Sequence, residues 1–166
     1  AFNMVNGMQG VLRNKMYLLR GLPASGKTTL AKELAAYVIA ADDYFYENGT
    51  RGVYEFDPSK LKEAHALCQK RAEDAMALGA AHHPIAVANT FTCRWELEPY
   101  LVLASKYDWL VVVIDLFDGG VTDEQLVARG EHGVPVAGIR QMRARYEHCW
   151  RTGDPRAPWD RGCSGV

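Results

Sequence analysis

The sequence has no strong charge imbalance and no long apolar run. Its 19 lysines and arginines stand against 20 aspartates and glutamates, which leaves a formal net charge of -1 at pH 7. The chain therefore lacks the global basic field that draws many proteins to nucleic acid, and any such binding would have to use a local patch. No apolar stretch reaches the roughly 20 residues of a membrane-spanning helix, so we expect no membrane partner.

Cysteine motifs are also missing. The four cysteines form no C-x-x-C pair, and none has a histidine at zinc-finger spacing. Free thiols in a reducing compartment are the expected state, which favours a cytoplasmic location. The adjacent His82 and His83 precede Pro84 in a predicted turn, where no neighbouring cysteine or carboxylate completes a metal site. The cysteines are Cys68, Cys93, Cys149 and Cys163.

The length favours a single domain. A chain of 166 residues that is 48% hydrophobic and 23% charged suits one globular unit with one sizeable core. Residues 1–15 lack the apolar segment of a secretory signal, and we interpret them as a flexible leader. Residues 152–166 contain Gly, Pro and Arg and predict an irregular basic tail. The domain itself is predicted over residues 16–151, and the oligomeric state stays open.

A complete phosphate-binding motif stands near the start of the predicted domain. Residues 21–28 read G-L-P-A-S-G-K-T, which matches G-x-x-x-x-G-K-T without a mismatch. An apolar run precedes the motif and a helix-forming run follows it, as a P-loop requires. In such a loop, backbone N–H groups and a helix N-terminus bind phosphate oxygens. The predicted nucleotide-binding residues are Gly21, Leu22, Pro23, Ala24, Ser25, Gly26, Lys27, Thr28 and Thr29, with Lys27 on the β- and γ-phosphates and Thr28 on Mg²⁺.

Apolar runs and helical patterns alternate along the chain. The alternation predicts an α/β fold, in which a parallel sheet is covered by helices on both faces and ligands bind at the carboxyl ends of the strands. Strands are predicted at residues 16–20, 38–41, 84–88 and 109–116. Helices are predicted at residues 27–37, 57–79, 94–106, 122–129 and 136–150, and a loop at 46–56.

An acidic pair follows the second predicted strand. Asp42 and Asp43 stand at its carboxyl end, fifteen residues after Lys27, where a doubly wound sheet faces bound phosphates. Phosphoryl transfer to an alcohol needs a carboxylate that orients the acceptor hydroxyl and takes its proton. At least one of the pair is therefore a candidate base. The alternative role, in which aspartate caps a turn or a helix, is also common.

A third cluster lies after the helix predicted at residues 122–129. Arg129 and His132 are followed by Gly133 and Pro135, a composition that suits a mobile lid. An arginine that closes over the phosphates would neutralise charge in the transition state. In the alternative, Arg129 caps its own helix or pairs with Glu131, and the sequence leaves both interpretations open.

Basic and aromatic residues are candidates for binding the acceptor molecule. The arginines of the last helix and tail suit contacts with nucleic-acid phosphates, although a solvated helix face is the usual outcome for such a run. Some aromatic residues near the acidic pair must belong to the core, and others are placed to stack a base. The arginines are Arg140, Arg143, Arg145, Arg151, Arg156 and Arg161; the aromatic residues are Tyr44, Phe45, Tyr46, Tyr54, Phe56, Phe91 and Trp95.

Five blocks occur in order: G-L-P-A-S-G-K-T-T-L-A, A-D-D-Y-F, Y-E-F-D-P-S-K-L-K-E-A-H, N-T-F-T-x-x-W-E-L and R-G-E-H-G-V-P. Together, over about residues 16–148, they resemble the polynucleotide-kinase-like P-loop kinases, which include the phage 5′-hydroxyl kinase and ATP-binding domains of some ubiquitin-ligase-binding proteins. The resemblance implies a nucleoside-monophosphate-kinase-like fold and an ATP-dependent kinase that uses Mg²⁺. By position it makes Asp42 the general base, Lys27 and Thr28 the phosphate and Mg²⁺ contacts, and Arg129 the lid arginine. Residues expected beside the acceptor are Asp43, Tyr44, Phe45, Asn89, Thr90 and His132.

The chain departs from this family's pattern at three places. Ala88 stands where the family commonly has an acidic residue before Asn-Thr, so a carboxylate that could organise metal, lid or acceptor is absent and activity could be altered. The lid motif reads Arg129-Gly130 rather than Arg-Asn. The phage enzyme carries an arginine for the acceptor's 3′-phosphate shortly after its acidic pair, whereas this chain has the aromatic run 44–46. That difference leaves room for a hydroxyl carried on a flipped base.

These observations lead to one principal interpretation and two alternatives. The principal one is an ATP-dependent kinase that phosphorylates a hydroxyl on nucleic acid, with DNA as the expected partner, either at a 5′ end or on a hydroxymethyl base. A small-metabolite kinase of the same fold is the second reading, and a non-catalytic ATP-binding interaction module is the third. No N-K-x-D motif for guanine occurs, which argues against a GTPase.

Overall fold

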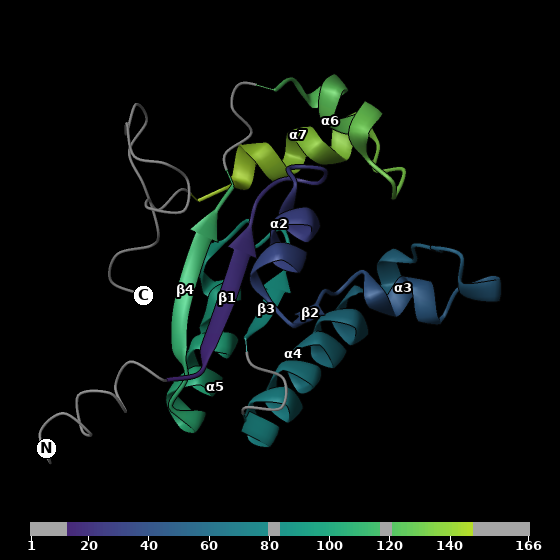
Figure 1. Ribbon diagram of the computed structural model, residues 1–166. Coiled ribbons are helices and arrows are strands. Elements are labelled where there is room, and N and C mark those ends of the chain that lie inside the picture. The colour runs from purple at the N-terminus through teal and green to yellow at the C-terminus, as the bar shows by residue number, and fades with distance from the viewer. Residues whose placement is uncertain (1–12, 80–83, 117–120, 148–166) are drawn as a thin grey trace, which may run out of the picture.

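The computed structural model describes residues 13–79, 84–116 and 121–147 (Figure 1). The predicted leader lies mostly outside these residues, and the predicted tail and the pair His82-His83 lie wholly outside them. The described strands are β1 (Lys15–Arg20), β2 (Tyr37–Ile39), β3 (Ile85–Ala88) and β4 (Leu110–Asp115). They form one parallel sheet in the order β2-β3-β1-β4, so β1 and β3 are the central strands.

The strands form where the sequence is apolar on both faces. All four residues of β3 are buried, and within the sheet Leu19 of β1 lies beside Ala88 on one side and Ile114 on the other. Strands buried on both faces need helices above and below them. The parallel register also brings the carboxyl ends of all four strands to one edge, directly before the segments that carry the predicted site residues.

The helices cover both faces of the sheet. On one face, α4 and α5 pack on Met16, Leu18 and Val87. On the other face, α2 places Ala31 against Leu19 and its neighbours. In Figure 1, α6 and α7 lie beyond the carboxyl ends of β1 and β4. The described helices are α2 (Lys27–Leu34), α3 (Asp43–Glu47), α4 (Leu61–Leu78), α5 (Glu98–Tyr107), α6 (Asp123–Arg129) and α7 (Val136–Arg145), with 3-10 turns at Thr50–Gly52, Pro58–Lys60 and Arg94–Leu97.

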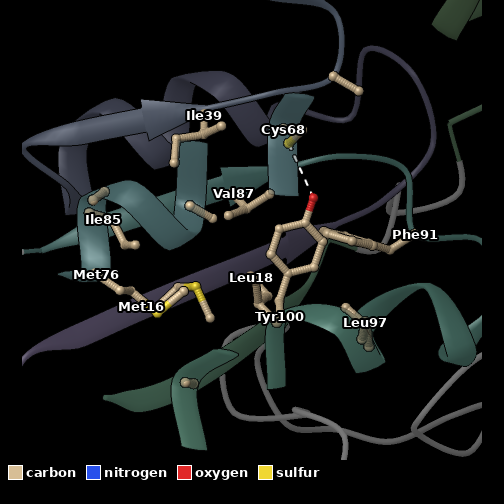
Figure 2. Packing of buried hydrophobic residues seen from close by; sticks show 14 of the residues in the cluster. Met16, Leu18, Ile39, Cys68, Met76, Ile85, Val87, Phe91, Leu97 and Tyr100 are labelled. Carbon is tan, nitrogen blue, oxygen red and sulfur yellow. Dashed lines mark hydrogen bonds between the residues drawn. The ribbon is translucent and has the colours of Figure 1, made fainter. Parts of the chain in front are cut away.

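The main core is a cluster of interlocked apolar side chains between the sheet, α4 and α5 (Figure 2). Tyr100 is one of its fully buried members, and its hydroxyl donates a hydrogen bond of 3.2 Å to the Cys68 thiol. Burial raises the pKa of Cys68 above its ordinary value. The thiol is therefore an unreactive core group, in line with the predicted free cysteines, and Cys68 and Cys93 are both free in the described part of the chain.

Most predicted elements are confirmed, with differences at their ends. The first helix stops at Leu34 rather than at residue 37, because Tyr37 enters β2. The predicted loop at 46–56 begins with the last residues of α3 and contains a 3-10 turn. The capping box at Thr122 is present, and Asp57 accepts a hydrogen bond from the Ser59 N–H just before α4. No helix among the described residues is long and apolar enough to cross a membrane.

Candidate active site

The predicted P-loop joins β1 to α2 in a tight turn. Gly26 has φ 96°, a left-handed conformation that glycine adopts without strain, and it stands directly before the first residue of α2. A side chain at Gly21 would come within 2.6 Å of the Ser25 Oγ and 3.0 Å of the Leu116 carbonyl oxygen. Both glycines are thus required by the geometry, and the turn leaves the N-terminus of an eight-residue helix facing outward as an anion site.

Lys27 is folded back over this loop. Its ammonium group donates hydrogen bonds to the carbonyl oxygens of Gly21 at 2.9 Å and Leu22 at 2.8 Å. Burial of the ammonium lowers the pKa of Lys27 to about 8, and the nearby Asp42 carboxylate partly opposes this shift. A cation that is poorly solvated has a strong preference for an added anion. Lys27 is therefore poised to exchange loop carbonyls for phosphate oxygens.

The remaining residues of the loop divide into buried and accessible ones. The Ser25 hydroxyl is buried without a hydrogen-bond partner, which marks an oxygen directed at the space inside the loop. Thr28 and Thr29 are exposed in the first turn of α2, whereas Gly21 and Leu22 are buried and Pro23 and Ala24 are partly buried. Gly21 also donates its N–H to the carbonyl oxygen of Thr90, which ties the loop to the segment after β3.

The residues fit a magnesium ion held largely by phosphate and water. Mg²⁺ keeps several waters and takes one or two protein oxygens in such sites. The accessible Thr28 hydroxyl, next to Lys27, is an oxygen donor of the required type. Among the described residues there is no group of three His, Cys, Asp or Glu side chains that could hold a metal by themselves.

Asp42 lies at the centre of a network of four side chains that come from three segments. The Tyr54 hydroxyl donates to Asp42 Oδ1 at 3.0 Å, and His132 Nδ1 lies 3.3 Å from Asp42 Oδ2. The other ring nitrogen of His132, Nε2, is 2.9 Å from the Tyr46 hydroxyl. The rings of Tyr54 and His132 are stacked with centroids 4.2 Å apart. The Asp42 side chain is nevertheless 46% exposed, so an incoming hydroxyl can reach it.

Asp43 has a different role from its neighbour. Its carboxylate accepts the Ala40 N–H at 3.0 Å and so closes the turn between β2 and α3. Burial raises the pKa of Asp43, and the hydrogen bond from Ala40 works against that rise. The turn-capping alternative thus describes Asp43, while Asp42 is the member of the pair that faces other segments.

Two of the residues expected beside the acceptor, Phe45 and Asn89, have side chains that are buried in the core. Phe45 is only 2% exposed, because α3 turns its ring inward between Tyr54 and Phe56. Asn89 is buried as well, and its amide oxygen accepts the Ala41 N–H at 2.9 Å while its amide nitrogen donates to Cys68. Neither side chain is available to a ligand, and Asn89 serves to hold the backbone that precedes Asp42.

Three further candidate residues have side chains that do not contact Asp42 in this structure: Tyr44, Thr90 and Arg129. The Tyr44 hydroxyl donates to Glu63 on α4, which directs it away from Asp42. Thr90 contributes its carbonyl oxygen to the P-loop. Arg129 ends α6 with an exposed side chain, and it makes no ion pair with Glu131 or any other described residue. The ion pair with Glu131 is therefore not formed, whereas the position of Arg129 in the last turn of α6 is compatible with both the helix-capping role and the lid role.

The arginines of α7 are mostly committed to partners within the fold. Arg140 binds Glu124 at 2.6 Å and Arg143 binds Asp123 at 2.8 Å, both across to α6. Arg145 donates to the Thr92 hydroxyl at 3.1 Å. These contacts neutralise much of the charge excess that the sequence indicated for this helix. The other predicted arginines, at positions 151, 156 and 161, lie outside the described residues.

The α6–α7 unit is fastened to the rest of the molecule at two places. Leu126 and Ile139 pack on Leu22 of the P-loop. At the far end of α7, Tyr146 donates its hydroxyl to the buried Asp115 at 2.7 Å, and its ring lies 4.5 Å from the buried Arg20 guanidinium. We call these three residues the Tyr146 clamp. The sequence analysis did not find it, because its members are about 30 or more residues apart.

Comparisons with known proteins agree with this architecture. The family described as the AAA domain matches residues 16–149. The chain belongs to this family. A human relative, NEDD4-binding protein 2, is 37% identical over 142 residues, which cover 80% of this chain but only 8% of that protein. This chain therefore corresponds to a small part of its relative.

Solved structures resemble the chain at the level of the fold. A protein from Chloroflexus aurantiacus that has been provisionally described as a kinase superposes with a TM-score of 0.58 at 18% identity, covering 81% of this chain and 80% of that one. A chain of the Pnkp1/Rnl/Hen1 RNA repair complex gives a TM-score of 0.57 at 16% identity, covering 80% of this chain and 44% of that one. The predicted P-loop kinase fold is thereby confirmed.

Proposed function

We propose that this domain is an ATP-dependent kinase that transfers the γ-phosphate to a hydroxyl group on a nucleic acid. The observation that carries the proposal is Asp42, an accessible carboxylate oriented by Tyr54 and His132 and close enough to Lys27 to influence its pKa. A base for the acceptor and a cation for the phosphates thus share one edge of the sheet, as phosphoryl transfer requires.

In the proposed reaction, the acceptor hydroxyl gives its proton to Asp42 as its oxygen bonds to the γ-phosphorus. The bond between that phosphorus and the β,γ-bridging oxygen breaks, so the products are a phosphate monoester and ADP. Lys27 and the exposed Arg129 stabilise the negative charge on the transferred group. Mg²⁺, with Thr28 as a protein ligand, supplies further charge neutralisation when it is bound.

The surroundings of Asp42 support a nucleic-acid acceptor with an exposed base. Tyr46, Tyr54 and the His132 ring lie next to the carboxylate, and aromatic faces stack bases at about 1–3 kcal/mol each. With Phe45 in the core, this stacking role passes to Tyr46 and Tyr54. The acceptor is a 5′ end or a hydroxymethyl group on a base of DNA.

A non-catalytic ATP-binding module is the second candidate, and Ala88 favours it. Ala88 ends β3 at the edge where the P-loop begins, and it is buried against the α2 side of the sheet. A side chain without a carboxylate at this point removes a group that could organise metal or acceptor. Nucleotide would then bind without being consumed.

The test is transfer of labelled phosphate from ATP to a panel of acceptors. The panel contains 5′-hydroxyl DNA and RNA oligonucleotides, duplex DNA with hydroxymethyl bases, and small sugar alcohols. Labelling of a nucleic acid that disappears in Asp42→Asn supports the proposal. Labelling of small alcohols alone overturns the nucleic-acid acceptor. ATP binding by calorimetry without transfer to any acceptor favours the non-catalytic module.

A further inference from the structure

We infer that His132 is the positioning residue for the Asp42 carboxylate, and this inference rests on the proposed function. His132 stands in the segment between α6 and α7, ninety residues from Asp42 in the sequence. It is the only residue described in this segment that reaches the Asp42 side chain, through the 3.3 Å approach of Nδ1 to Oδ2. The contact therefore joins the proposed base to the segment that carries Arg129.

The four-residue network determines which nitrogen of His132 carries hydrogen. His132 Nδ1 lies 3.3 Å from Asp42 Oδ2, and because an ionised carboxylate cannot donate a hydrogen, this close approach favours the tautomer with its hydrogen on Nδ1. In the neutral ring, Nε2 then accepts the hydrogen of the Tyr46 hydroxyl. Tyr46 is suited to donate, because burial raises its pKa and the carboxylates of Glu131, Asp42 and Asp43 raise it further. In this tautomer Tyr46 donates to His132, and the His132 ring in turn directs its N–H side at the Asp42 carboxylate.

The network holds Asp42 without consuming its capacity as a base. Tyr54 uses one acceptor position on Oδ1 and His132 approaches Oδ2 to 3.3 Å, so at most two of the roughly four acceptor positions of the carboxylate are occupied. Two positions therefore remain for the acceptor hydroxyl, on a side chain that is partly exposed. The stacked Tyr54 ring in turn fixes the plane of the imidazole. Asp42 is thereby held from both oxygens in one orientation.

The location of His132 makes the orientation of Asp42 depend on the segment between α6 and α7. Arg129, the last residue of α6, lies three residues earlier in the chain, and Gly133, at φ 66°, follows His132 directly. The segment that brings an arginine toward the phosphates thus also delivers the group that orients the base. Asp42 is fully positioned only while this segment is docked, so acceptor activation depends on the state of the lid.

Two matched substitutions separate the two sides of the imidazole. His132→Asn retains an N–H near the position of Nδ1, which faces Asp42, and His132→Gln retains a polar group near the position of Nε2, which faces Tyr46. Steady-state transfer is measured with wild type, both variants, Asp42→Asn and the control His65→Gln. His65 lies on α4 and is not part of the network.

We expect His132→Gln to lower kcat about tenfold to a hundredfold, as misplacement of a reacting group does, with the KM for ATP within twofold of wild type. His132→Asn should recover most of that loss, and the urea midpoints of the two variants should agree. Wild-type kcat in His132→Gln, or equal losses in both variants, would overturn the inference. A wild-type protein without transfer, or an Asp42→Asn variant with full activity, shows instead that the proposed function itself fails.

Discussion

The phosphate-donor half of the candidate site consists mainly of backbone groups, whereas the acceptor half consists of side chains. The donor half, residues 21–29, is made of backbone: a left-handed glycine, a helix N-terminus and carbonyl oxygens that hold Lys27. The acceptor half is made of side chains from three segments: Asp42 directly before α3 and Tyr46 within it, Tyr54 in the following loop, and His132 beyond α6. A backbone site is encoded by one short motif, whereas a side-chain site exists only after the chain has folded.

The comparison implies that the two halves can be damaged separately, and Lys27→Ala is the strongest test. Removing the only predicted phosphate cation of the P-loop should lower the transfer rate on the order of a thousandfold or more. Circular dichroism should show an intact fold, because the lysine binds only loop carbonyls in this structure. Activity near wild type would refute the assignment of the donor half.

Asp42→Asn should damage the acceptor half alone. The amide keeps the shape of the side chain and cannot take a proton, so we expect turnover to fall about a hundredfold to ten-thousandfold. The affinity for ATP, measured by calorimetry, should change little. Asp43→Asn is the matched control: it can still accept the Ala40 N–H, and it should retain most activity. An inactive Asp43→Asn with an active Asp42→Asn would reverse the roles of the pair.

Phe45→Ala should damage neither half of the site directly but the fold beneath the acceptor half. Loss of a fully buried phenylalanine ring typically costs about 3–5 kcal/mol of unfolding free energy, which urea denaturation can measure. Phe56→Ala, whose side chain is 52% exposed, should cost clearly less. Unchanged stability together with a selective loss of acceptor use would restore Phe45 to the stacking role that the sequence suggested.

The smallest expected effect concerns the charge of Lys27. Phosphate binding favours the ammonium form, so the pKa of Lys27 should rise from about 8 on binding, and the complex should take up a fraction of a proton near pH 8. Affinity for ATP should therefore be full below pH 8 and fall as the pH rises above it. Calorimetry in two buffers of different ionisation enthalpy measures the uptake, and Lys27→Met should abolish it.

The free protein should show the opposite trend in stability. The pKa of Lys27 is lower in the folded state than the ordinary lysine value of 10.5, so between about pH 8 and 10.5 the unfolded chain binds more protons. The contribution of this residue to the unfolding free energy should then increase with pH across that window. A contribution that decreases there would contradict the lowered pKa.

Features that depend on nearby residues could be predicted from the sequence, whereas features that depend on contacts between distant segments could not. The strands, the P-loop and the capping box depend on neighbours within a few residues, so local patterns located them. The burial of Phe45 and Asn89 could not be predicted, because proximity to Asp42 in the sequence says nothing about which way a side chain points. The partnership of His132 with Asp42 and Tyr46 could not be predicted, because it depends on how α6 and α7 dock on the P-loop. The sequence singled out all three residues as candidates, but the contacts between them are visible only in the folded structure.

The Tyr146 clamp sets the limit at which the domain can be cut. A boundary chosen from the helix alone would fall after Arg145, where α7 ends. Such a fragment would lose the hydroxyl that binds Asp115, the ring beside Arg20, and the backbone N–H of Glu147, which donates to Thr92 at 2.8 Å. The buried Asp115 and Arg20 would each lose one of their contacts, and loss of a hydrogen bond to a charged group costs about 1.5–3 kcal/mol. A fragment that retains these contacts must therefore include Tyr146 and Glu147, which directly follow α7.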